Sequence, residues 1–152
     1  KPRQLIPFLI AAAWLGVIFF LSSQNGEQTA DLSLGIVGVI HRALQSVGIR
    51  ININHLHHAL RTSAHVIVFF VEGSLLYWAI NGLTRQRRVS FLAALIVAIP
   101  LCALDELHKL PIPGRHCQWD EAALNFVGAA LGILVCLTFV SFLRRRRQQV
   151  VK

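Results

Sequence analysis

The chain has 152 residues, of which 55% are hydrophobic and only 14% are charged, and its formal net charge is +8. The charged fraction is well below the roughly 25% of soluble domains, and the apolar residues gather in long runs, which excludes an ordinary soluble domain. The basic residues lie just beyond these runs, so they indicate membrane orientation and argue against nucleic-acid binding.

Four apolar runs are candidates for membrane spans. They cover residues 5–21, 63–80, 91–104 and 122–143. The third run is short for a hydrocarbon core about 30 Å thick. Extending it as a helix through His108 nearly spans that thickness and places Asp105, Glu106 and His108 in its last turn.

Residues 29–47, between the first two runs, carry apolar side chains at helical spacing. This pattern predicts a helix that lies on the membrane surface or dips partly into it. His55, His57 and His58 follow in a predicted loop. The expected fold class is therefore all-α, an integral membrane bundle of four transmembrane helices with one interfacial helix between the first and second. We expect a single transmembrane domain over residues 1–152.

The Lys and Arg residues are distributed unequally between the two sides of this bundle. Ten of the 15 fall on the side that holds both termini, and five fall on the other. Because cytoplasmic loops are enriched in Lys and Arg, we expect both termini in the cytoplasm, with a basic cytoplasmic tail at 144–152. The expected location is the bacterial inner (plasma) membrane, as a multi-pass protein. All seven His residues fall on the outer side.

Two features inside the spans have alternative interpretations. Glu72 lies near the middle of the second span, either neutral and hydrogen-bonded to a neighbouring helix, which we favour, or part of a buried path. Gly128 and Gly132 form a G-x-x-x-G motif in the fourth span. We expect this motif to pack against another helix of the same chain, the alternative being a dimer interface.

Polar residues gather at the outer ends of the predicted spans. Arg61 and His65 lie one helical turn apart at the start of the second span, and the sequence Asp-Glu-Leu-His closes the third at 105–108. Arg115 follows in a loop that contains proline and glycine, and Asp120 and Asn125 begin the fourth span. A charged side chain beside lipid costs roughly 2.5–3.5 kcal/mol at a helix centre. This density of charge therefore favours a functional site.

In order and spacing these motifs resemble the VanZ family of small bacterial membrane proteins. The most specific part is D-E-x-H at 105–108, followed by P-G-R at 113–115, Asp120 and N-x-x-G at 125–128. The resemblance implies a bundle of four or more helices. The family's namesake is associated with resistance to teicoplanin, a lipid-bearing glycopeptide. Lys109 stands where Gln often follows the D-E-x-H motif, which leaves the hydrogen-bond network of the site open.

The residues themselves support several kinds of site. Arg61 and Arg115 could clamp a phosphate or carboxylate. The acidic residues and a His could hold a divalent metal, although their spacing matches no standard zinc signature. A His paired with a carboxylate could carry out acid–base chemistry. An ion-pair network that only locks the helix ends together is the structural alternative. The catalytic candidates are His65, His108, Asp105 and Glu106.

We expect an outward-facing pocket that binds an anionic lipid head group or amphiphile and confers teicoplanin-type glycopeptide resistance. The alternative is a membrane enzyme, a hydrolase or transferase acting on a lipid-linked phosphate, with His65 or His108 as acid or base. It has no recognisable nucleophile, and Ser63 and Cys117 are candidates only by their proximity in the sequence. Expected partners are membrane lipids and a lipid-linked envelope precursor or lipoglycopeptide, and we assign no metal or cofactor. The expected ligand-binding residues are Arg61, His65, Asp105, Glu106, His108, Arg115, Asp120 and Asn125.

Overall fold

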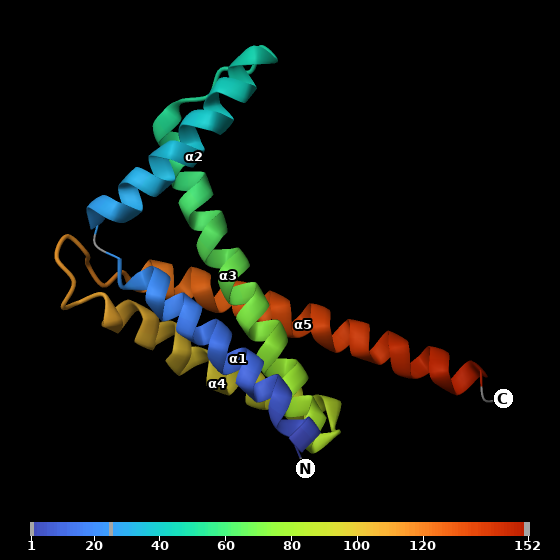
Figure 1. The fold of residues 1–152 in the computed structure, drawn as a ribbon. Helices are drawn as coiled ribbons and strands as arrows, with labels where there is room; N and C mark the ends of the chain where they lie inside the picture. Colours follow the sequence, from blue (N-terminus) through green and yellow to red (C-terminus); the bar gives the residue numbers. More distant parts are fainter. Residues whose placement is uncertain (1, 25, 151–152) are drawn as a thin grey trace.

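The computed structural model describes residues 2–24 and 26–150, and this part of the chain contains five α-helices and no strand (Figure 1). The helices are α1 (Pro2–Ser22), α2 (Gly26–Ser46), α3 (Ile53–Thr84), α4 (Arg87–His108) and α5 (Trp119–Val150). All except α2 are long and apolar enough to cross a membrane. The all-α fold and the four candidate spans are confirmed, whereas the placement of α2 at a membrane surface stays a prediction.

The long helix α3 begins well before the predicted span because its first turn is capped. The side chain of Asn52 accepts a hydrogen bond of 2.9 Å from the backbone N–H of Asn54. This bond satisfies one of the unpaired donors at the start of the helix. His55, His57 and His58 therefore lie in the first two turns of α3, and their predicted placement in a loop was wrong.

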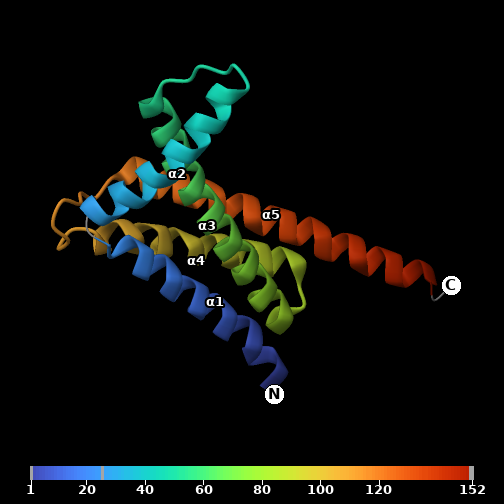
Figure 2. The ribbon, with the colours of Figure 1, turned by 45° about the horizontal axis from the view of Figure 1, so that its top comes forward.

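Helix α3 is the centre of the arrangement. It contacts each of the other four helices, whereas α2, within the described part of the chain, packs against α3. Figures 1 and 2 show α3 crossing α5, with α2 and the first turns of α3 projecting away from the remaining helices. The apolar core between the helices includes Phe69, Tyr77, Ala94, Ala98 and Ile133.

The outer faces of the four apolar helices carry large exposed hydrophobic side chains. Leu9 of α1, Ile96 of α4 and Phe139 of α5 are each at least 60% exposed. Extended apolar surface of this kind marks contact with a membrane or another protein. Helix α5 continues through the arginine run at 144–147, so the predicted basic tail is helical as far as Val150.

Glycines bring α3 and α5 into close contact. Gly128 faces the backbone carbonyl of Val66, and Gly132 faces that of Phe70. Gly73 of α3 lies in the same way against the backbone of α5, and a Cβ atom at any of the three would overlap the opposing chain. The predicted packing of the G-x-x-x-G motif against a helix of the same chain is confirmed.

Candidate functional site

A chain of hydrogen bonds joins four helices where the end of α1, the end of α4 and the start of α5 meet α3. Ser22 of α1 donates its hydroxyl to Oδ1 of Asp105 in α4, at 2.5 Å. Asn125 of α5 donates Nδ2 to the other carboxylate oxygen of Asp105, at 3.2 Å. The Oδ1 atom of Asn125 lies 3.1 Å from Nδ1 of His65 in α3. Asp105 and Asn125 are fully buried, so these bonds satisfy groups that water cannot reach.

The order of donors along this chain determines which nitrogen of His65 carries the proton. The carboxylate of Asp105 can only accept, so the amide of Asn125 directs its NH₂ group toward it. The amide oxygen of Asn125 then faces His65 and must accept from Nδ1–H. The remaining nitrogen, Nε2, lies 3.6 Å from Oε2 of Glu121. His65 is therefore held with Nε2 able to take up a proton beside a carboxylate.

A buried lysine is the centre of a second set of contacts. The ammonium of Lys109 lies 2.5 Å from Glu106, 3.1 Å from Glu121 and 3.7 Å from Asp105. Lys109, Glu106 and Asp105 are each at most 1% exposed. The second oxygen of Glu106 accepts a hydrogen bond of 3.1 Å from the backbone N–H of Gln118. We call these three carboxylates, of Asp105, Glu106 and Glu121, the carboxylate cage of Lys109.

Two arginines approach the same region from different elements. Arg61 of α3 forms an ion pair of 2.7 Å with Glu121. Arg115, in the loop between α4 and α5, donates Nε–H to the backbone carbonyl of Gln24 at 3.1 Å. The loop turns at Gly114, whose φ of 74° favours glycine. Burial and, next, the like charge of Arg61 lower the pKa of the Arg115 guanidinium from its ordinary value.

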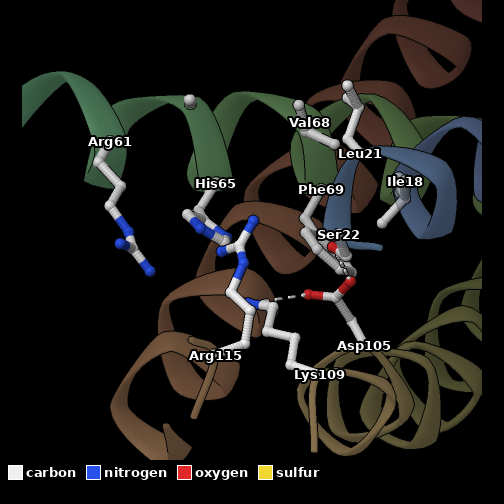
Figure 3. A pocket seen from close by; sticks show the side chains of 11 residues that line it. Ile18, Leu21, Ser22, Arg61, His65, Val68, Phe69, Asp105, Lys109 and Arg115 are labelled. Carbon is white, nitrogen blue, oxygen red and sulfur yellow. Dashed lines mark hydrogen bonds and ion pairs between the residues drawn. The ribbon is translucent and has the colours of Figure 1, made fainter. Parts of the chain in front are cut away.

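These side chains surround one pocket of about 170 Å³ (Figure 3). One wall is apolar and comes from α1 and α3, with Ile18, Leu21, Val68 and Phe69. The other end of the pocket is polar, and Figure 3 shows Arg61, His65 and Arg115 together there, with Arg61 and His65 preceding the apolar residues along α3. The remaining lining residues are Ser22, Ala64, Asp105 and Lys109. We call this the amphipathic pocket, because it offers both an apolar surface and positive charge.

One group of residues has the composition of a metal site. His65, Asp105 and Glu106 offer ligand atoms within 4.8 Å of one another. Such a set of one nitrogen and two carboxylate oxygens would suit several divalent ions. The ammonium of Lys109 already lies against both carboxylates, so a metal ion there would have to displace it.

Comparison with known proteins identifies the family of this chain. A sequence model described as VanZ/LLP1 matches residues 8–141. The chain belongs to the VanZ/LLP1 family. No curated protein and no solved structure matches it. The resemblance drawn from the D-E-x-H motif and the motifs after it is confirmed. Together with its four long apolar helices, family membership makes this VanZ/LLP1 chain a multi-pass membrane protein.

Most of the predicted ligand residues of this VanZ/LLP1 protein lie close together. Arg61, His65, Asp105 and Arg115 line the amphipathic pocket. Glu106 and Asn125 do not line the pocket but form hydrogen bonds with two residues that do, Lys109 and Asp105.

Two predicted residues lie elsewhere. His108 is exposed and meets the ring of Phe19 edge-on, with ring centroids 5.3 Å apart. Asp120 is also exposed and lines a neighbouring pocket, together with Glu121. Neither His108 nor Asp120 is among the residues of the amphipathic pocket.

Sequence reasoning missed Lys109 and Glu121 as members of the site. Glu121 could have been predicted from its spacing, because it precedes Asn125 by four residues and therefore lies on the same face of the helix. Lys109 had been noted only as a departure from the family pattern. Asp105 and Glu106 precede it by four and three residues, a helical spacing that indicated these two contacts, whereas nothing in the sequence indicated the approach of Glu121 from α5.

Other predictions concerned reactive or buried groups. Ser63 and Cys117 were the candidate nucleophiles, and neither lines the amphipathic pocket. Ser63 is exposed. The serine that lines this pocket is Ser22. Glu72 is 2% exposed, and its Oε2 atom has no hydrogen-bond partner in the described part of the chain. The hydrogen bond that we favoured for Glu72 is therefore not found at this oxygen.

Proposed function

We propose that the amphipathic pocket binds an anionic lipid head group or amphiphile in the cell envelope. The observation that supports this function most is the pocket's division into two ends, with Arg61, His65 and Arg115 at one end and apolar residues of α1 and α3 at the other. An amphiphile has the same division, because its charged group adjoins an acyl chain. The arginine guanidinium suits phosphate and carboxylate, since its planar donors match two oxygens at once.

The charge of the two arginines favours an anion between them. Arg61 is one cause of the lowered pKa of Arg115, which means that the two guanidinium groups repel each other. An anion placed between two like-charged groups would reduce this repulsion. The burial of Arg115, which also lowers its pKa, would strengthen the attraction by limiting screening by water.

The membrane setting belongs to the same proposal. The protein would lie in the bacterial plasma membrane with both termini in the cytoplasm and the pocket at the outer face, as the distribution of Lys and Arg predicts. Helix α2 would lie along the outer surface. Its exposed apolar residues Leu34, Ile36 and Val39 support that placement, because they would otherwise face water.

The ligand class connects this pocket to drug sensitivity. A lipid-linked envelope precursor and a lipoglycopeptide both join an apolar hydrocarbon chain to polar groups, so either could occupy an amphipathic pocket. We propose that occupancy reduces sensitivity to teicoplanin-type glycopeptides. Vancomycin, which has no acyl chain, is the matched comparison drug.

The test is drug susceptibility in a sensitive Gram-positive host that expresses the chain. We expect tolerance of teicoplanin to rise for the wild type, to be lost in Arg115→Ala, and to persist in Arg50→Ala. Arg50 is an exposed residue of the α2–α3 connection and serves as the control for charge removal. Wild-type expression in the membrane without any change in tolerance would refute the resistance role, and an unchanged Arg115→Ala would refute the pocket's part in it.

A second candidate function is a membrane hydrolase or transferase acting on a lipid-linked phosphate. The observation that favours it is His65, which lines the pocket between Asn125 and Glu121 with Nε2 directed to a carboxylate. This is the arrangement of a general acid or base. Release of phosphate from a lipid phosphate by the wild type, and its loss in His65→Gln, would establish this function. Equal release by both proteins, or none by either, would exclude the hydrolase.

A further inference from the structure

A second pocket, of about 210 Å³, adjoins the amphipathic pocket. Arg61 and His65 line both, so these two side chains form a shared wall. The second pocket is formed by the early turns of α3 and the first turns of α5, and its residues are largely polar. We call it the polar pocket. Its other lining residues are His57, His58, Thr62, Gln118, Asp120, Glu121 and Leu124.

The two acidic residues of the polar pocket differ in their partners. Glu121 is paired with Arg61 and Lys109, so its charge is compensated. Asp120 makes no hydrogen bond or ion pair with any described residue of the protein. The cations that line the polar pocket are Arg61 and, when protonated, the imidazoles of His57, His58 and His65. Asp120 therefore leaves an uncompensated negative charge in the polar pocket, next to the shared wall of Arg61 and His65.

A single ligand that extended through both pockets would meet a positive site at Arg61 and then a negative site at Asp120. Arg61 faces both spaces, so a phosphate bound at its guanidinium would have an apolar surface on one side and Asp120's pocket on the other. If the head group carried a second negative charge beyond the phosphate, Asp120 would repel it. A head group that ends in an ammonium would be attracted by it.

We propose that the protein binds a zwitterionic amphiphile whose phosphodiester lies at Arg61 and Arg115 and whose primary amine lies in the polar pocket at Asp120, as in a lipid with a phosphoethanolamine head group. This proposal rests on the proposed function and adds the head group to it. The amine would be the feature that distinguishes this ligand from other anionic lipids of the same chain length.

The test measures binding of three short-chain lipids to the full chain in detergent micelles by native mass spectrometry. The lipids are phosphatidic acid, phosphatidylglycerol and phosphatidylethanolamine, so that only the group beyond the phosphate changes. We expect the wild type to bind the ethanolamine lipid about two- to fivefold more tightly than the glycerol lipid, the range expected of one exposed ion pair. Asp120→Asn should remove this preference, and Asp31→Asn, which removes a carboxylate from α2, should keep it.

The outcomes separate the two proposals. Equal binding of all three lipids by wild type and Asp120→Asn, with loss in Arg61→Ala, would overturn the amine site and leave the anion site standing. A preference for the glycerol lipid would also overturn the amine site, since it would indicate a hydroxyl head group. Failure of the wild type to bind any of the lipids would overturn both proposals.

Discussion

Replacement of Lys109 by Met tests whether the carboxylate cage is ionised and held together by its ammonium. The ammonium lies between 2.5 and 3.7 Å from three carboxylates, two of them fully buried. Met keeps the apolar stem and removes the charge. At an effective dielectric constant of about 20, a pair of unit charges about 3 Å apart interacts by roughly 5 kcal/mol. Desolvation of the ammonium offsets several kcal/mol of this, so we expect Lys109→Met to lower the free energy of unfolding by about 3–5 kcal/mol.

Equilibrium unfolding by sodium dodecyl sulfate in micelles, followed by far-UV circular dichroism, measures this change. The double variant Lys109→Met with Glu106→Gln removes opposite charges and should recover a large part of the loss. Arg50→Met removes an exposed cation and should stay within about 0.5 kcal/mol of the wild type. A Lys109→Met protein that unfolds within 1 kcal/mol of the wild type would refute the reasoning, because the cage would then be neutral or hydrated.

Two further substitutions test the packing and the hydrogen-bond chain in the same titration. Gly132→Ala places a Cβ against a carbonyl of α3 and should cost about 1–3 kcal/mol, whereas Gly16→Ala, with nothing within 4 Å of its Cβ, should be neutral or slightly stabilising. Equal effects of the two would contradict the close approach of α3 and α5. Asn125→Asp replaces an amide donor 3.2 Å from Asp105 by a second carboxylate and should destabilise the protein at neutral pH. Acidification should relieve this loss because one of the paired carboxylates then takes up a proton, and a loss that does not depend on pH would count against the assigned hydrogen bond.

The fold was predictable because membrane spans depend on length and apolar composition, which the sequence states directly. The start of α3 was missed for a local reason. Asn52 begins a helix that continues through a polar segment into the span, and hydropathy detects only the apolar part of such a helix. The third run shows the opposite case: it was too short to span as it stood, and extending it to His108 gave the observed end of α4.

The motif residues of the site were predictable, whereas some of the residues that surround them were missed. Arg61, His65 and Asp105 were expected from residue type and spacing, and all three line the pocket. The carboxylate cage was predictable only in part. Asp105 and Glu106 lie four and three residues before Lys109 at the end of α4, so helical spacing brings their carboxylates to its ammonium. Glu121 belongs to α5 and reaches Lys109 only when α4 and α5 meet.

Glu121 joins the carboxylate cage and Asp120 does not, and the reason is which of them lies on the face of α5 that packs against α3. Glu121, Asn125, Gly128 and Gly132 occur at spacings of four, three and four residues, which places them on one side of a helix. The glycines bring this side onto the backbone of α3, so the polar residues at its start must face α3 as well. Asp120 is one position off this stripe and faces the polar pocket. Packing and chemistry therefore depend on a single register of α5, and a shift of that register by one residue would exchange the two carboxylates.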